Sequence, residues 1–318
     1  MQAALKKTFF SNGKLLLTGE YTVLDGSRAL ALPTKFGQFL DVEPGTGQAI
    51  NWKSLDADGS TWFDETLTFK EIAGNLTAGK PPETATLLNI LNTAWQANPE
   101  ILKDADGFTV TTRLTFPRHW GLGTSSTLIN NIAKWFGINA FDLLTKSFGG
   151  SGYDIACAQH DTPIVYQLEN NSPKVEKALF NLPFADKLYF IYLNRKQDSR
   201  QAITAYRERR NDIAAILPQV DILTQTIVEC SSLADFCKAL ETHEELMSGI
   251  LGMPTVKQSQ FPDFTGTIKS LGAWGGDFVL ATSDGNPESY FLGKGFGTII
   301  PYQKMILNSG LDLSPDIL

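Results

Sequence analysis

The sequence breaks sharply at residues 121–126, Gly121-Leu122-Gly123-Thr124-Ser125-Ser126, where a glycine-rich turn leads directly into a helical pattern. Apolar residues recur after the turn at helical spacing, from Leu128 to Phe136. The first backbone N–H groups of a helix have no partner inside the helix, and the positive end of the helix dipole lies beside them. The turn is therefore suited to binding an anion such as a phosphate.

The residue types in this turn permit two interpretations. Gly121 and Gly123 allow positive φ and the close approach of a ligand, and the hydroxyls of Thr124 and Ser125 can contact phosphate oxygens or Mg2+. Because Ser and Thr are also common helix caps, the stretch alone is compatible with an ordinary capped turn. It is not a Walker loop, which needs a lysine before the hydroxyl residue, and it lacks a complete dinucleotide-binding fingerprint.

The rest of the chain predicts an α+β protein of two domains. Strands are expected at residues 14–18, 21–24, 29–32, 37–42, 107–114, 163–168, 188–193 and 278–281. Helices are expected at residues 82–97, 199–210, 213–228 and 232–251. Asn, Ser and Pro accumulate at residues 170–174, so we place the boundary there, with domains at 1–170 and 171–318.

The composition excludes several classes of protein. With 318 residues, of which 42% are hydrophobic and 19% charged, the chain is typical of a soluble globular protein with a large core. No apolar run approaches the roughly 20 residues that span a bilayer, and the first ten residues show no signal-peptide pattern. We therefore expect a cytoplasmic protein without a membrane partner.

The net charge of −7 argues against a nucleic-acid partner. Three cysteines without a CxxC pair predict neither a disulfide framework nor a zinc site.

Three segments, in the right order, resemble the motifs of the GHMP kinase superfamily, and they are closest to those of phosphomevalonate and mevalonate kinases. The first motif is Gly13-Lys14-Leu15-Leu16-Leu17-Thr18-Gly19-Glu20-Tyr21 and its continuation to Ala31. The second is Pro117 followed by residues 121–126. The third is Lys269-Ser270-Leu271-Gly272-Ala273-Trp274-Gly275-Gly276-Asp277. The resemblance spans residues 13–277. It implies a two-domain GHMP kinase fold: an N-terminal ribosomal-protein-S5-like domain with a left-handed βαβ unit, a C-terminal ferredoxin-like domain, and an active site between them.

The resemblance also implies ATP and Mg2+ as cofactors. The nucleotide-binding residues would be Pro117, Gly121, Leu122, Gly123, Thr124, Ser125 and Ser126. Ser125 matches the family serine that can contact the metal. The family often supplies a second metal ligand from a glutamate before its catalytic aspartate, but this chain has no glutamate between Ser126 and Asp154.

Asp154 and Lys14 are the predicted catalytic residues. The segment Gly150-Ser151-Gly152-Tyr153-Asp154-Ile155-Ala156 resembles the aspartate segment of phosphomevalonate kinases. By that resemblance, Asp154 would orient or deprotonate the acceptor hydroxyl, and Lys14 would stabilise charge on the transferred phosphoryl group. Alternatively, Asp154 only caps a helix that begins at Ile155, and Lys14 is a solvated surface lysine.

A second group of matching residues would form the substrate side of the site: Glu20, Ser151, Gly152, Lys196, Gly272, Gly275 and Gly276. Trp274 stands where the family usually has glycine. We expect Trp274 to pack in the domain core, although it could instead lie over the nucleotide loop.

Three details favour a phosphomevalonate kinase over a mevalonate kinase, which is the close alternative. They are Tyr21 after Glu20 where mevalonate kinases usually have histidine, the Gly-Gly-Asp ending at Asp277, and the Gly-Ser-Gly-Tyr-Asp segment. The motifs are also compatible with a kinase for a different small alcohol or sugar, with an ATP-dependent decarboxylase of the same fold, and with a non-catalytic sensor. The partner would be a small-molecule substrate. A homodimer is compatible with the sequence, which does not determine the oligomeric state.

Overall fold

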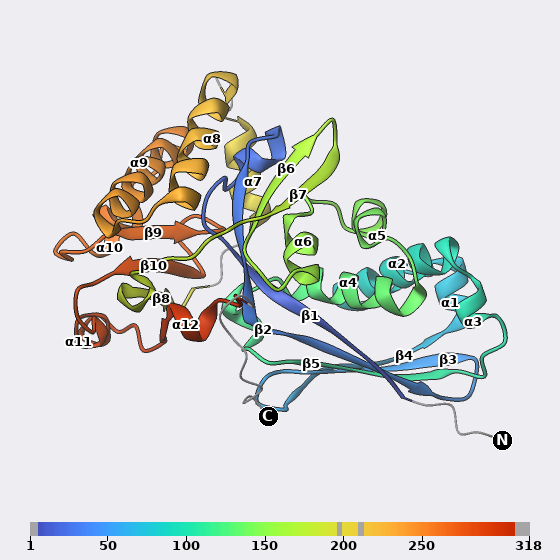
Figure 1. The fold of residues 1–318 in the computed structure, drawn as a ribbon. Helices are drawn as coiled ribbons and strands as arrows, with labels where there is room; N and C mark the ends of the chain where they lie inside the picture. Colours follow the sequence, from blue (N-terminus) through green and yellow to red (C-terminus); the bar gives the residue numbers. More distant parts are fainter. Residues whose placement is uncertain (1–5, 196–198, 209–212, 309–318) are drawn as a thin grey trace. The chain divides into compact units, whose positions relative to one another are not determined.

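The computed structural model describes residues 6–195, 199–208 and 213–308 of an α+β chain (Figure 1). The chain divides into two compact units. Unit 1 contains Met1–Gly13, Phe36–Arg118 and Leu122–Gln159, and unit 2 contains Lys14–Lys35, His119–Gly121 and His160–Leu318. The expected boundary at residue 170 falls inside unit 2, in the turn between two strands, so the contact-based units divide the chain differently from the predicted domains.

Unit 1 is built on a sheet in which the strands follow the order β4-β3-β5-β2. The strands are β2 (Ala29–Pro44), β3 (Ala49–Leu55), β4 (Thr61–Thr68) and β5 (Phe108–Leu114), and β1 (Lys7–Leu16) pairs with β2. β3 and β5 are parallel, whereas the β3–β4 and β2–β5 pairs are antiparallel. A parallel pair needs a crossover, and this one contains β4 and the helices α1 (Phe69–Gly74), α2 (Pro82–Ala97) and α3 (Glu100–Lys103).

Helices cover one face of this sheet, as Figure 1 shows for α2 and α4. Besides α1–α3, they are α4 (Thr124–Phe136), α5 (Ala140–Ser147) and α6 (Tyr153–Gln159). The core between the layers combines inward-facing strand residues such as Trp52 and Val110 with helix residues such as Leu88, Ile129 and Phe136. The predicted helix at 82–97 has the expected bounds, because its apolar residues recur on one face and pack in this core.

Unit 2 contains a four-stranded antiparallel sheet of order β11-β8-β10-β9. The strands are β8 (Leu188–Tyr192), β9 (Ile268–Leu271), β10 (Phe278–Thr282) and β11 (Ile299–Pro301). Helices lie between β8 and β9 in the chain, and α11 (Glu288–Gly293) lies between β10 and β11. This βαββαβ order is the expected ferredoxin-like arrangement.

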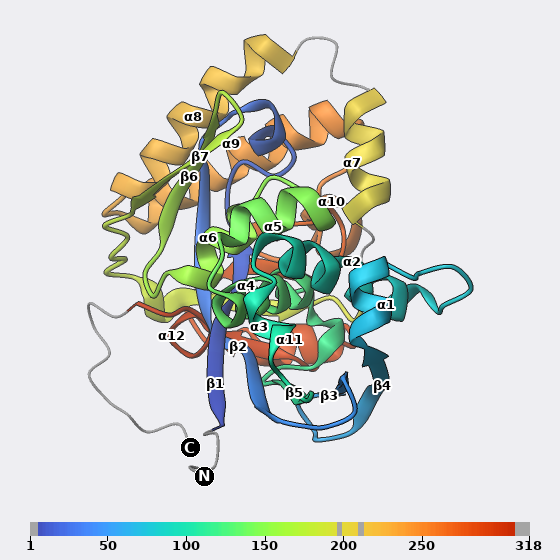
Figure 2. The same cartoon turned by 90° about the vertical axis from the view of Figure 1, so that its right-hand side faces the viewer.

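The other elements of unit 2 are a hairpin and several helices. They are β6 (Ile164–Glu169), β7 (Ser172–Lys177), α7 (Ser199–Glu208), α8 (Ile213–Glu229), α9 (Leu233–Leu251), α10 (Val256–Gln260), α12 (Tyr302–Met305) and the 3-10 helices at Thr22–Asp25, Arg118–Trp120 (of which Arg118 belongs to unit 1) and Ala185–Lys187. The long helices α8 and α9 pack side by side (Figure 2). Every helix among the described residues is too short or too polar to cross a bilayer.

Two strand predictions need correction. Residues 21–24 were expected to form a strand, but Thr22–Asp25 is a 3-10 helix, because Tyr21 has φ 61° and the N–H of Leu24 bonds to the Tyr21 carbonyl. The strand from Ala29 was expected to end at Pro33, but β2 continues to Pro44. β6 pairs only with residues 29–31 of β2, so the missing N–H of Pro33 breaks no bond of that ladder.

Candidate active site

Helix α4 starts at a glycine, which cannot cap the helix with a side chain. Gly123 is the N-cap residue, with φ +91°, and it has no side chain to accept from the N–H groups of the first turn. The first helical bond runs from the N–H of Thr127 to the Gly123 carbonyl, at 3.0 Å. The N–H groups of Thr124, Ser125 and Ser126 therefore precede the helical ladder, and they lie where an anion would be bound.

The hydroxyl residues of the turn do not act as its N-cap. Thr124 and Ser125 lie inside the first turn of α4; Ser125 is exposed, and Thr124 and Ser126 are half-buried. Leu122, by contrast, is fully buried and anchors the turn. The alternative of an ordinary Ser/Thr-capped turn is therefore wrong, and phosphate binding at this turn stays a prediction.

A buried polar network fixes α4 in unit 1. Its members are Ser11 on β1, Gln38 on β2 and Thr127, Asn130 and Asn131 on α4, each at most 1% exposed. The hydroxyl of Thr127 donates to Gln38 Oε1 (2.8 Å), and Asn131 Nδ2 donates to the Gln38 carbonyl (2.9 Å). Ser11 donates to Asn131 Oδ1 (2.7 Å) and accepts from Asn130 Nδ2 (2.8 Å). Such a network is favourable in one arrangement only, so it determines how α4 is rotated and placed.

Helix α6 carries the predicted catalytic aspartate of unit 1. The N–H of Ala156 bonds to the Gly152 carbonyl at 3.1 Å, so the helix begins before Asp154, which is half-buried in the first turn. The alternative in which Asp154 caps a helix starting at Ile155 is therefore wrong. α6 packs beside α4, where Gln159 Nε2 donates to Asn130 Oδ1 at 2.9 Å. Ser151, which directly precedes Gly152, is buried.

In unit 2, Asp277 lies against the first glycine of the loop. Gly121 has φ +70°, and a Cβ built there would lie 2.2 Å from Asp277 Oδ2. The backbone of Asp277 is held by two bonds: its N–H donates to the Arg195 carbonyl, and its carbonyl accepts from Leu193, both at 2.8 Å. Asp277 was not among the predicted site residues, although the sequence contains a signal in the Gly-Gly-Asp ending of the third motif.

The two residues before Gly121 are anchored on the unit 2 sheet. The hydroxyl of Tyr192 on β8 donates to the His119 carbonyl at 3.0 Å. The ring of Trp120 packs edge-on against Phe278 on β10, with ring centroids 5.5 Å apart. The exposed ring of His119 also lies beside Tyr192, with ring centroids 5.4 Å apart.

The third motif forms a tight glycine turn, which we call the third glycine segment (residues 272–276). Gly272 and Gly275 have φ +70° and +76°. Trp274 is 2% exposed and packs with Tyr21, Tyr206 and Met247, while its Nε1 donates to the Pro254 carbonyl at 3.2 Å. The expectation that Trp274 packs in a core is confirmed. Gly276 completes the segment, and its predicted contact with substrate, like those of Gly272 and Gly275, stays a prediction.

The remaining predicted residues have different surroundings. Lys14 lies on β1 and is half-buried, so it is not the fully solvated lysine of the alternative interpretation. Glu20 is 1% exposed and forms an ion pair with Lys269 inside unit 2. Lys196 falls outside the described residues. Pro117 is half-buried directly before the 3-10 helix that leads into the loop.

The described residues contain no cluster of three or more His, Cys, Asp or Glu side chains that could hold a metal ion. A Mg2+ ion commonly keeps several waters and binds through few protein groups together with substrate phosphates. A single hydroxyl such as that of Ser125, exposed at the start of α4, fits such a site.

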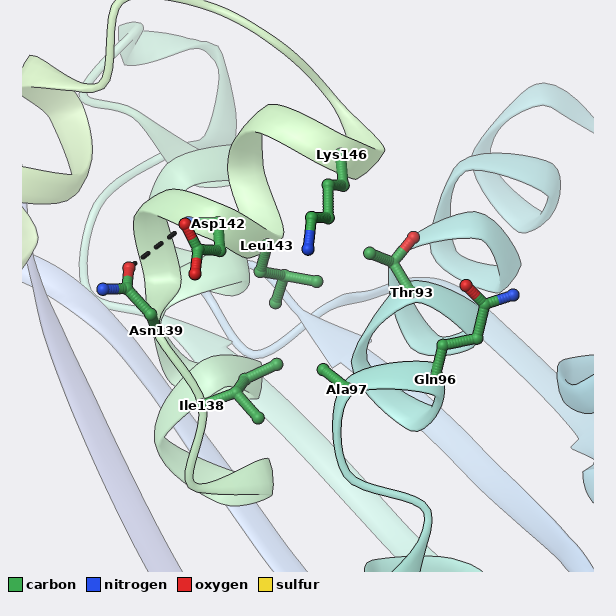
Figure 3. A pocket seen from close by; sticks show the side chains of 8 residues that line it. All are labelled: Thr93, Gln96, Ala97, Ile138, Asn139, Asp142, Leu143 and Lys146. Carbon is green, nitrogen blue, oxygen red and sulfur yellow. Dashed lines mark hydrogen bonds between the residues drawn. The ribbon is translucent and has the colours of Figure 1, made fainter. Parts of the chain in front are cut away.

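A separate cavity of about 270 Å³ lies in unit 1 between α2 and α5 (Figure 3). It is lined by Thr93, Gln96, Ala97, Ile138, Asn139, Asp142, Leu143 and Lys146, and by none of the predicted site residues. The side chain of Asn139 accepts from the N–H groups of Phe141 and Asp142, at 2.8 and 3.2 Å, so the start of α5 is already capped. For this reason we place the phosphate site at α4 and not here.

No protein-family model and no curated protein sequence matches the chain. Solved structures do match. A mevalonate kinase is 15% identical, with a TM-score of 0.68, over 92% of this chain and 98% of the other. Streptococcus pneumoniae phosphomevalonate kinase, solved with phosphomevalonate and AMPPNP, is 16% identical, with a TM-score of 0.66, over 95% and 98%. Lactococcus lactis galactokinase, solved with galactose, is 14% identical, with a TM-score of 0.68, over 91% and 88%. The chain thus has the GHMP kinase fold, and the fold prediction is confirmed.

Proposed function

We propose that this chain, which has the GHMP kinase fold, is an ATP-dependent kinase that phosphorylates a small molecule. The proposal depends above all on the start of α4, where the N-cap is a glycine, which has no side chain to accept from the first-turn N–H groups. The triphosphate of ATP would accept from the N–H groups of Thr124–Ser126. Bound Mg2+ would neutralise phosphate charge, and the Ser125 hydroxyl is the protein group we assign to hold it.

The acceptor end is assigned to Asp154 and Lys14. Asp154 would accept a hydrogen bond from the acceptor hydroxyl and orient it, or remove its proton, because a carboxylate within reach of that proton can act as a general base. Lys14 would stabilise the charge that spreads over the equatorial oxygens of the transferred group. In phosphoryl transfer the protein contributes mainly positioning and electrostatic stabilisation. The charged groups of Asp154 and Lys14 would supply the electrostatic part.

We further propose phosphomevalonate as the acceptor, with mevalonate as the close alternative. The TM-scores of mevalonate kinase, phosphomevalonate kinase and galactokinase lie between 0.66 and 0.68, so the fold does not distinguish among these acceptors. The preference depends on the motif residues Tyr21, Asp277 and the Gly-Ser-Gly-Tyr-Asp segment. Because no apolar run approaches the length that spans a bilayer, we also propose a cytoplasmic location.

A second candidate function is a non-catalytic sensor of the same fold. It is favoured by the absence of a glutamate between Ser126 and Asp154, where the family often has a metal ligand. Nucleotide binding without turnover would distinguish this function from a kinase.

The deciding experiment is coupled ADP release with MgATP and a panel of acceptors. The panel contains mevalonate, phosphomevalonate, diphosphomevalonate, homoserine and several sugars. We expect release that depends on phosphomevalonate. Release with another compound would name that acceptor, and carbon dioxide from diphosphomevalonate would identify a decarboxylase. No release with any acceptor, despite measured ATP binding, would contradict the kinase proposal and favour the sensor.

A further inference from the structure

Two consecutive residues of the first motif contact the third motif in the interior of unit 2. Glu20 forms an ion pair with Lys269, at the start of that motif. The hydroxyl of Tyr21 accepts from the N–H of Trp274 at 2.7 Å, in the middle of the third glycine segment. The two contacts therefore hold Lys269 and Trp274, the first and last residues of this stretch, against the turn that contains Glu20 and Tyr21.

The ion pair belongs to a fully buried group of charges, the Glu20 cluster (Glu20, His243, Glu244 and Lys269). Lys269 Nζ also lies 3.2 Å from Glu244 Oε2 and donates to the Ser270 carbonyl at 2.6 Å. His243 Nε2 accepts from the N–H of Gly19 at 3.1 Å, and burial and the nearby Lys269 lower the pKa of His243 well below 6.5. The imidazole is therefore neutral, and the ionisable partners of Lys269 in the cluster are the carboxyl groups of Glu20 and Glu244.

Stability alone does not account for this cluster. Removing charges from water costs several kcal/mol per ion, and apolar residues of similar volume are often as stable or more so. Burial raises the pKa of Glu20 to about 7, although Lys269 opposes the shift, so the pairing does not fully compensate for desolvation. In some proteins a buried ion pair specifies the position of its partners instead.

The backbone at Tyr21 leads to the same conclusion. A bulky residue with φ 61° is strained by roughly 1–3 kcal/mol, and such strain persists only where surrounding contacts impose it. Here the ring of Tyr21 stacks on Tyr206, with centroids 5.7 Å apart, and the Tyr206 hydroxyl donates to Asp25 at 2.7 Å. The strain is retained at the point where the chain turns Glu20 and Tyr21 toward the third motif.

Asp277 directly follows the third glycine segment, and its carboxylate lies against Gly121. We propose that Glu20, Tyr21 and Lys269 are positioning residues for the phosphoryl transfer proposed above: they hold the third glycine segment and, through Asp277, the start of the phosphate loop. The inference thus rests on the proposed function. In this role Glu20 contacts neither ATP nor acceptor, in contrast to the substrate contact that the motif resemblance implied.

The test compares ATP kinetics of the wild type with three variants. Tyr21→Phe removes only the hydroxyl that accepts from Trp274. Lys269→Met breaks the ion pair. The double variant Glu20→Leu/Lys269→Met replaces the pair with apolar groups while Glu244 keeps its bonds to Ser270. The matched control is Lys187→Met, which breaks an exposed pair with Asp284 (2.8 Å) in the same unit.

We expect Lys269→Met to lower kcat/KM for ATP roughly tenfold to a hundredfold, and Tyr21→Phe less, with the KM of the acceptor unchanged. The double variant should melt at a higher temperature than Lys269→Met, because one fewer buried carboxyl group lacks its partner, but it should not recover kcat/KM for ATP, because a core without the pair does not fix the loop. Lys187→Met should match the wild type. Amide hydrogen exchange at residues 272–277 should be faster in Lys269→Met.

Two outcomes would overturn the inference while leaving the kinase intact. One is wild-type kcat/KM for ATP in Tyr21→Phe and in the double variant, which would make the cluster structural only. The other is unchanged hydrogen exchange at residues 272–277. A wild type that turns over no acceptor would instead contradict the proposed function itself, and with it the reaction that these residues would serve.

Discussion

The carboxylate of Asp277 occupies the space that a side chain at Gly121 would need. A Cβ on Gly121 would lie 2.2 Å from Asp277 Oδ2 and 2.3 Å from its Cγ, and φ is +70° there. Gly121→Ala must therefore displace Asp277 as well as adopt a strained backbone. We expect it to weaken ATP binding at least roughly tenfold, measured by calorimetric titration, since the start of the phosphate loop would shift.

Gly79→Ala is the matched control for Gly121→Ala. Gly79 has a similar φ of +76°, but nothing lies within 4 Å of a Cβ built there. It should cost about 1 kcal/mol of stability from backbone strain and leave ATP binding unchanged. The double variant Gly121→Ala/Asp277→Ala should recover part of the stability that Gly121→Ala loses. Equal effects of the two alanine substitutions on ATP binding would refute the assigned contact.

Asp154→Asn keeps the shape of the side chain and removes its capacity to act as a base. We expect turnover to fall at least roughly a hundredfold while the Kd for ATP changes little, because the role assigned to Asp154 concerns the acceptor hydroxyl. Asp142→Asn is the control, since Asp142 is an exposed acidic residue in the first turn of a neighbouring helix. Unchanged turnover in Asp154→Asn would remove Asp154 from the mechanism.

Trp274→Ala tests the packing role of the tryptophan. Trp274 is 2% exposed among Tyr21, Tyr206 and Met247, so its removal leaves a large cavity and an unbonded Pro254 carbonyl. We expect a loss of about 3–5 kcal/mol in urea unfolding. Leu179→Ala, at a residue that is 93% exposed, should change the free energy by less than about 0.5 kcal/mol. A similar small change for Trp274→Ala would contradict its place in the core.

Glu20 predicts a pH dependence of stability with a definite sign. Burial raises its pKa from 4.5 to about 7, so the folded state binds the proton more tightly than the unfolded state does. The stabilisation is complete below about pH 4.5 and is lost as the pH rises through about 7, and it amounts to about 3 kcal/mol. Urea unfolding of the wild type and Glu20→Gln at about pH 5 and about pH 8 measures it.

The comparison with Glu20→Gln isolates this contribution from its neighbours. Burial and Lys269 lower the pKa of His243 well below 6.5, so His243 acts in the opposite direction in both proteins. In the wild type, Glu20 and Glu244 raise the pKa of Lys269 despite its burial, so Lys269 stays charged. The stability of the wild type relative to Glu20→Gln should fall between the two pH values. Parallel pH profiles would show that Glu20 does not titrate in this range.

Local patterns in the sequence correctly predicted the elements whose apolar residues recur at a regular spacing. The helix at Pro82–Ala97 and the strand at Phe108–Leu114 agree with the expected ranges, because apolar spacing and turn residues act over a few positions. The same reasoning failed at Tyr21–Leu24. There β-forming residues adopt a 3-10 helix, because contacts of Tyr21 with Trp274 and Tyr206 hold a backbone angle that local propensity disfavours.

The sequence by itself determined the order of the three motifs, the glycine turn before α4 and hence the fold to expect. Only the tertiary structure decided that Glu20 is buried against Lys269, that Trp274 fills a core and that Asp277 lies against Gly121. Gly121 and Asp277 are separated by 156 residues along the chain, Glu20 and Lys269 by 249, and Tyr21 and Trp274 by 253. A periodic pattern specifies which face of an element is buried, whereas the partner across that face depends on how distant segments pack, and this is a property of the folded chain.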